Sequence, residues 1–133
     1  MGDALPDRYA CFLWFNEGSS ELSPLAKNLI EATENEIWVS IASLWEMAIK
    51  NSLGKLTIGS GYDTVLEDVI ANQMEILPIN FAHTSMLNRL PFHHRDPFDR
   101  MIIAQAIVES LNVISADESF NLYFEGLEIN RIW

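Results

Sequence analysis

The sequence predicts an α/β fold with a mostly parallel central sheet and helices on both of its faces. Segments of strand character alternate with segments of helical period, which is typical of βα units. The chain has 133 residues, the size of one domain, and its apolar content of 49% is enough for a buried core. No apolar run approaches the roughly 20 residues of a membrane span, so we expect no membrane partner.

Helix caps and residue periodicity place the elements in the first half of the chain. A serine followed by a proline, Ser23 and Pro24, is typical of a helix start. Either Ser40 or Ser43 can cap the next helix, and Gly54 suits its end. The expected order is an apolar run that could open a helix (12–16), a helix (24–35), a strand (36–40), a helix to about residue 54, a helix (62–74) and a strand (75–79).

The second half of the chain is placed by the same kinds of residue. Pro78 indicates that its strand lies at the edge of the sheet or ends there. Asn80 can cap one helix, and Asp96 with Pro97 can begin a stronger one. The expected order is a helix (81–90), a helix (97–111), a strand ending in Asp (112–117), a short helix (118–123) and a closing strand (127–133).

Asp99 is the most informative single residue in the sequence. It begins the apolar stripe of its predicted helix, which continues through Ile102, Ile103 and Ala106. An ionised carboxylate on a buried stripe needs a cation, a set of hydrogen-bond donors or a functional reason. A structural interpretation stays open, because Asp96 as N-cap with Asp99 three residues later resembles a capping box.

Two further acids follow predicted strands, where ligands of parallel sheets bind. Glu46 lies early in the helix after strand 36–40, although it can also form a surface ion pair with Lys50. Asp117 ends the strand 112–117, although it can also cap the helix that follows. If Glu46, Asp99 and Asp117 converge at one edge of the sheet, they form a site for a hard cation such as Mg²⁺ or Mn²⁺.

The charge of the chain limits how it can bind a polyanion. The formal net charge is -11, so attraction to nucleic acid needs a local basic patch, a partner chain or bound cations. One segment of twelve residues is rich in basic side chains: Arg89, His93, His94, Arg95 and Arg100. We interpret His93 and His94 as part of a basic, exposed loop rather than a zinc site, because adjacent histidines project differently. The lone Cys11 fits a reducing cytoplasm.

Three blocks of sequence resemble one known family. They are SLWEMAIK at 43–50, LPFHHRDPFDRMIIAQA at 90–106 and ISAD at 114–117, and together they resemble PIN domains, specifically the VapC-type toxins of toxin–antitoxin pairs. The resemblance runs from about residue 12 to residue 133. It implies a three-layer α/β/α fold in a single domain over 1–133, with residues 1–11 divergent. It also implies a divalent-metal-dependent endoribonuclease whose catalytic acids are Glu46, Asp99 and Asp117.

The first acid of the family pattern does not carry over directly. Counting back from Trp14, its expected position holds Arg8, and Asp7 is one residue away. The resemblance therefore implies metal ligation by Asp7, Glu46, Asp99 and Asp117, with Asp7 as a displaced first ligand. Arg95 or Arg100 would steady the phosphate oxygens of the RNA.

The function expected from the resemblance is an RNA-cleaving, VapC-like toxin that uses Mg²⁺ or Mn²⁺. Its expected partners are the RNA substrate, a VapB-like antitoxin and a second copy of the chain, in the cytoplasm. The alternative is a catalytically impaired PIN-fold module that binds RNA or a protein, for which Arg8 is the motive. A DNA-directed nuclease is a weaker alternative, because the chain is short.

Overall fold

The computed structural model describes residues 8–11 and 22–133. The strands are β1 (Arg8–Cys11), β2 (Glu36–Ser40), β3 (Glu75–Leu77), β4 (Asn112–Ile114) and β5 (Arg131–Ile132). The helices are α1 (Pro24–Glu31), α2 (Ile41–Ser52), α3 (Thr64–Ala71), α4 (Phe81–Arg89), α5 (Pro97–Glu109), the short 3₁₀ helix η2 (Glu118–Phe120) and α6 (Asn121–Phe124).

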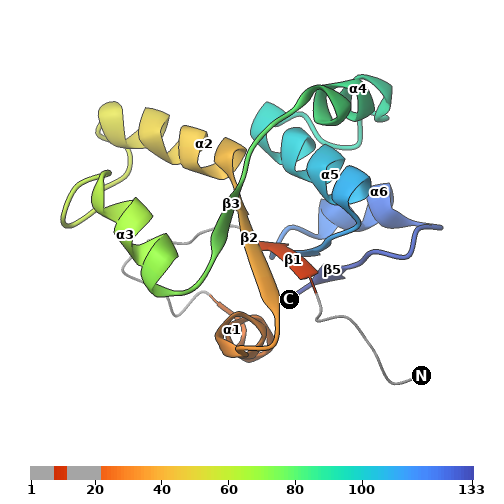
Figure 1. The fold of residues 1–133 in the computed structure, drawn as a ribbon. Helices are drawn as coiled ribbons and strands as arrows, with labels where there is room; N and C mark the ends of the chain where they lie inside the picture. Colours follow the sequence, from red (N-terminus) through yellow and green to blue (C-terminus); the bar gives the residue numbers. More distant parts are fainter. Residues whose placement is uncertain (1–7, 12–21) are drawn as a thin grey trace.

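The five described strands form one sheet in the order β3-β2-β1-β4-β5, and every pairing is parallel (Figure 1). In a parallel sheet the carboxyl ends of all strands lie at one edge, where ligands of α/β proteins bind. The predicted fold class is therefore confirmed. The short strand β3 is an edge strand, as Pro78 indicated.

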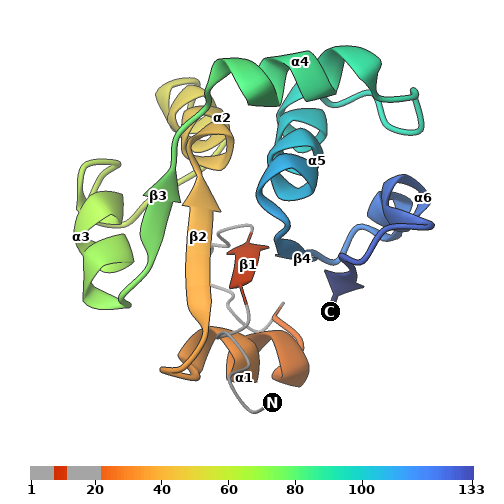
Figure 2. The same cartoon turned by 45° about the vertical axis from the view of Figure 1, so that its right-hand side comes forward.

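Helices cover both faces of the sheet and complete three layers (Figure 2). On one face Tyr9, Ile37 and Val39 pack in a core with α1, α2 and α3. On the other face Ala10 and Val113 pack in a second core with α4, α5 and α6. Neighbouring residues of a strand point to opposite faces, so β1, β2, β3 and β4 each contribute to both cores.

Helix α2 leaves β2 at the carboxyl edge of the sheet and lies beside α5. Ser40, rather than Ser43, caps α2, because its hydroxyl accepts a hydrogen bond from the backbone N–H of Ala42 at 3.0 Å. The buried side chain of Gln105 on α5 binds the Ser40 hydroxyl and donates to the carbonyl of Pro78 at 3.2 Å. Gln105 thereby joins α5 to the ends of β2 and β3.

The predicted helices and strands are present where the structure describes the chain, most of them with shorter bounds; strand 36–40 has the predicted bounds. Strand β1 was not predicted, yet it occupies the centre of the sheet between β2 and β4. The expected helix start at 12–16 lies outside the described residues. Among the helices described, none is long and apolar enough to cross a membrane.

Candidate active site

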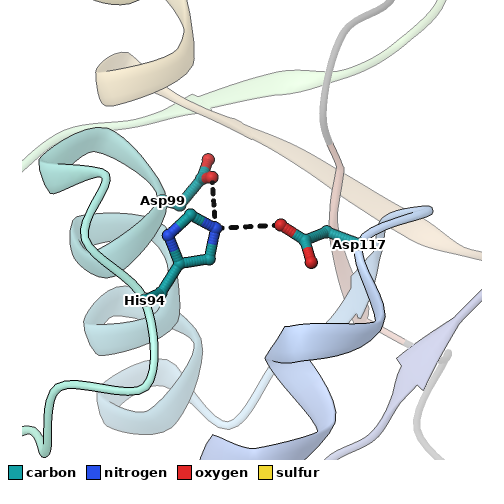
Figure 3. A group of neighbouring side chains, drawn as sticks. All are labelled: His94, Asp99 and Asp117. Carbon is teal, nitrogen blue, oxygen red and sulfur yellow. Dashed lines mark hydrogen bonds and ion pairs between the residues drawn. The ribbon is translucent and has the colours of Figure 1, made fainter.

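Three side chains from different segments meet beside the carboxyl edge of the sheet (Figure 3). Asp99 comes from the first turn of α5, Asp117 follows β4, and His94 lies on the loop before α5. The Nε2 atom of His94 is 3.0 Å from Oδ2 of Asp99 and 2.9 Å from Oδ2 of Asp117. One ligand atom from each of the three residues lies within 4.8 Å of the others, so they could share a metal ion.

Asp99 faces the site and is not the second half of a capping box. The Asp96 carboxylate caps α5 by accepting from the backbone N–H groups of Phe98 and Asp99 at 2.8 and 3.2 Å. In a capping box the Asp99 side chain would accept from the Asp96 N–H, but that N–H donates to Nδ1 of His94. Ile102 and Ile103 on the same stripe are fully buried. The stripe therefore carries a carboxylate that has no capping role.

The environment of Asp99 disfavours its charged form. Burial is the largest cause, and the negative charge of Asp96 adds to it, so that the pKa of Asp99 rises to about 7. His94 opposes this rise, whereas Glu46 and Asp117 reinforce it. Each neighbouring carboxylate disfavours the negative charge of Asp99, and a bound cation would relieve this repulsion.

Asp117 has both of the roles that its position in the sequence allowed. Its Oδ1 caps η2 by accepting from the backbone N–H and the hydroxyl of Ser119 at 2.9 and 2.6 Å, while Oδ2 faces His94. Burial raises the pKa of Asp117, but the hydrogen bonds from Ser119 and His94 outweigh it and hold this pKa below 3.8. The two carboxylates of the site are thus driven apart in pKa, which is typical of functional sites.

Glu46 lies near this group but does not belong to it. Its Oε2 forms an ion pair with Lys50 at 3.0 Å, the i,i+4 contact that the sequence left open. The Glu46 side chain is only 18% exposed, and its charge raises the pKa of Asp99. The hydrogen bond to Glu46 raises the pKa of Lys50 despite partial burial, and the charges of Asp96 and Asp99 add to that rise. Glu46 therefore stands beside the cluster, with Lys50 as its present counter-ion.

His94 is the site residue whose place the sequence did not predict. His93 and His94 do project differently, since His93 is exposed and its ring meets Tyr123, with 5.0 Å between centroids. The interpretation of both as an exposed loop is wrong for His94, whose side chain is 17% exposed. Its position two residues before the helix cap Asp96 is the only sequence feature that could have indicated its direction.

The side chain of Arg100 is buried, and its guanidinium is directed into the protein. Its guanidinium donates to the carbonyl of Pro91 at 2.7 Å and to the hydroxyl of Tyr123 at 3.3 Å. The same group lies 4.0 Å from the ring centroid of Phe92. Arg100 therefore holds the loop 90–96 that carries His94, and we leave it out of the proposed RNA contacts.

Arg95 was predicted to bind RNA and Asp7 to bind the metal, and only Arg95 lies within the described residues. Arg95 is exposed and, within the described residues, has no hydrogen-bond or ion-pair partner. Asp7 lies outside the described residues, so its role as a metal ligand stays a prediction. Its neighbour Arg8 begins β1 at the amino edge, where it binds Glu36 at 3.1 Å and the carbonyl of Glu109 at 3.0 Å.

Replacing Arg100 with Ala should lower the free energy of unfolding by about 2–4 kcal/mol, because buried carbonyls of the loop lose a charged donor. Arg95→Ala is the matched control from the same loop region, and it should change stability by less than about 0.5 kcal/mol. Urea unfolding of the two variants measures both values. Equal stability of the two variants would show that Arg100 does not hold the loop.

The match to known families agrees with this geometry. The family model described as PIN domain matches residues 5–123 of the chain. The chain belongs to the PIN domain family. A search of curated proteins finds no match. PIN domains are generally metal-dependent nucleases, which fits a group of acidic side chains at the carboxyl edge of a parallel sheet.

The side chains of this PIN domain suit a hard divalent cation. Asp99 and Asp117 offer carboxylate oxygens, the ligand type that Mg²⁺ and Mn²⁺ prefer. Burial and the neighbouring negative charges raise the pKa of Asp99 to about 7, and a bound cation would offset both causes. Asp99 and Asp117 would hold the ion. Glu46 lies close enough for its charge to raise the pKa of Asp99.

Proposed function

We propose that this PIN domain is a VapC-like endoribonuclease that cleaves RNA phosphodiester bonds with Mg²⁺ or Mn²⁺. The observation that carries the proposal is the pair Asp99 and Asp117. These two residues come from separate segments, and one ligand atom of each lies within 4.8 Å of the other. A bound divalent ion would lower the pKa of a water and neutralise charge on the scissile phosphate. Glu46, Asp99 and Asp117 are the proposed catalytic residues.

The residues around the pair prepare it for this task. Ser119 occupies Oδ1 of Asp117, while Oδ2 faces His94, and one ligand atom of Asp117 lies within 4.8 Å of one of Asp99. Two cationic side chains beside the site are exposed: Lys50, which pairs with Glu46, and Arg95, on the loop that carries His94. They could bind the phosphates that flank a cleavage point. Among the predicted phosphate contacts, Arg95 is the one that we retain.

The proposed partners are a cognate VapB-like antitoxin and a second copy of the chain, in the cytoplasm. Three apolar side chains four residues apart are exposed and support docking of a protein: Trp45 and Ile49 on α2 and Leu53 at its C-cap. Trp45 also packs edge-to-face on Phe98 of α5, 5.0 Å between centroids, so a partner on α2 would lie close to the acidic group.

A second candidate is a PIN-fold module that binds RNA or a protein without cutting. The observation in its favour is Arg8, which stands where the family pattern has its first acid. Because Arg8 is tied to Glu36 and Glu109 at the amino edge, a carboxylate at position 8 would begin β1 at the edge opposite the acidic group. Restoring Asp at position 8 is therefore not expected to restore a ligand.

Incubation with a labelled structured RNA should separate the two candidates. The nuclease predicts cleavage with Mg²⁺ or Mn²⁺, no cleavage with a chelator, and binding that weakens as salt is added, since a chain of charge -11 needs local cations. Arg95→Ala should weaken RNA binding without changing stability. Binding of intact RNA at equal affinity in chelator and in Mg²⁺ would support the binding module instead.

A further inference from the structure

Both ring nitrogens of His94 have defined partners, and this decides what the residue can do. Nε2 faces one carboxylate oxygen of Asp99 and one of Asp117, at 3.0 and 2.9 Å (Figure 3). On the other side of the ring, Nδ1 accepts a hydrogen bond from the backbone N–H of Asp96 at 3.1 Å. A backbone N–H can only donate, so Nδ1 must offer its lone pair.

The distances at Nε2 do not by themselves distinguish a metal ligand from a hydrogen-bond donor. Adjacent ligand atoms around an octahedral ion at about 2.1 Å are about 3 Å apart, the same spacing as a hydrogen bond. The tautomer does distinguish them. A neutral imidazole with a lone pair on Nδ1 carries its proton on Nε2, whereas ligation through Nε2 needs the proton on Nδ1.

The backbone that carries the ring is held by further hydrogen bonds. The His94 backbone N–H donates to the hydroxyl of Tyr123 at 2.8 Å, and Arg100 holds the same hydroxyl and the Pro91 carbonyl. Turning the ring over would put carbon atoms at both nitrogen positions and lose the contacts to Asp96, Asp99 and Asp117.

A second histidine in the chain has the same pattern and no metal-site neighbours. The buried His83 accepts from the backbone N–H of Asn80 through Nδ1 at 3.1 Å, and its Nε2 lies 2.8 Å from Oε2 of Glu109. There the ring is a structural link between α4 and α5. His83 is therefore an internal reference for a histidine that donates from Nε2 to a carboxylate.

We propose that His94 is a positioning residue that donates Nε2–H to Asp117, with an Asp99 oxygen 3.0 Å from the same nitrogen, and so holds the two carboxylates together until a divalent cation replaces it. This rests on the proposed function, since it concerns the same acidic pair. Without this donor the negative charges of the two ionised carboxylates would face each other uncompensated. A cation bound between them must displace the Nε2–H contacts, so His94 competes with the ion instead of ligating it.

The tautomer is measured directly by long-range ¹H–¹⁵N NMR of the imidazole rings in metal-free protein at mildly alkaline pH. We expect His94 and the reference His83 to show a protonated Nε2 and an unprotonated Nδ1, with His94 assigned by its loss in His94→Gln. A protonated Nδ1 on His94 alone would overturn the proposal. This readout does not depend on any cleavage of RNA.

Titration with Mn²⁺, followed by the EPR signal of the free ion, tests the competition. His94→Ala should bind Mn²⁺ about tenfold more tightly than the wild type, because no hydrogen bond has to be displaced. His94→Gln keeps an N–H near the place of Nε2 and should return the affinity toward the wild-type value. His93→Ala, the exposed neighbour, is the matched control and should change nothing. Circular dichroism checks that each variant is folded.

The outcomes separate the two proposals. If His94 is a ligand, His94→Ala should weaken Mn²⁺ binding by at least about tenfold, and that result would overturn the positioning role. If no variant binds Mn²⁺ while His94 shows the Nε2–H tautomer, the proposed metal nuclease fails and the donor role of His94 is retained. Tighter binding by His94→Ala supports both.

Discussion

Asp99→Asn should abolish metal-dependent RNA cleavage, lowering the rate by more than about a hundredfold. Asparagine keeps the shape of the side chain but loses the negative charge that a hard cation requires. The α5 cap is made by Asp96, so the helix start is preserved in the variant. Single-turnover cleavage of a labelled RNA at saturating Mg²⁺ measures the loss.

Asp96→Asn is the matched control for this change. It removes an acid from the same helix turn, yet asparagine is as good an N-cap as aspartate, so the fold is retained. Cleavage by this variant should stay within a few-fold of the wild type, because the Asp96 carboxylate accepts the cap hydrogen bonds and is not a proposed ligand. Undiminished cleavage by Asp99→Asn would contradict the assignment of Asp99 to the metal.

The metal-free protein should lose stability as the pH rises from about 4 to about 7. Asp99 ionises near 3.8 in the unfolded chain but near 7 in the folded one, so the folded state binds the proton more strongly over this window. Stability therefore falls with rising pH, and the loss is complete above about pH 7. The shift corresponds to a loss on the order of 4 kcal/mol as an upper bound.

Urea unfolding at about pH 5 and about pH 8, in chelator, measures this loss for the wild type and for Asp99→Asn. The difference between the two proteins isolates Asp99, and Asp68→Asn, an exposed acid on α3, is the control that should keep the wild-type dependence. Mg²⁺ at the higher pH should restore stability to the wild type only. Equal pH profiles for the wild type and Asp99→Asn would show that burial and the neighbouring acids do not raise the pKa of Asp99.

The fold class followed from the sequence because local features agree with the tertiary structure. Ser23, Asn80 and Asp96 each cap the helix that they were expected to cap, and the edge position of β3 followed from Pro78. Strand β1 was missed for a physical reason. A central parallel strand normally reads as a continuous apolar run. Here it is four residues that begin with Arg8, and the small Ala10 fills a buried place.

A site residue could be predicted where a charged side chain stood on the apolar stripe of its own helix. It could not be predicted where contacts between distant residues set the direction of the side chain. Asp99 stood out because a carboxylate occupied an apolar stripe, and the structure brings it to Asp117. His94 did not stand out, because its direction depends on a loop held by Arg100 and Tyr123. For the same reason Arg100 looked like a phosphate contact, although its charge is used inside the protein.

The central claim is that Asp99 and Asp117 share a divalent cation at the carboxyl edge of the sheet, with Glu46 beside them. Anomalous diffraction from crystals soaked in Mn²⁺ tests it directly. We expect one strong peak between the two carboxylates, at about 2.1 Å from an oxygen of each, with Nε2 of His94 outside ligand distance. A peak elsewhere, or no peak at saturating Mn²⁺, would contradict the claim.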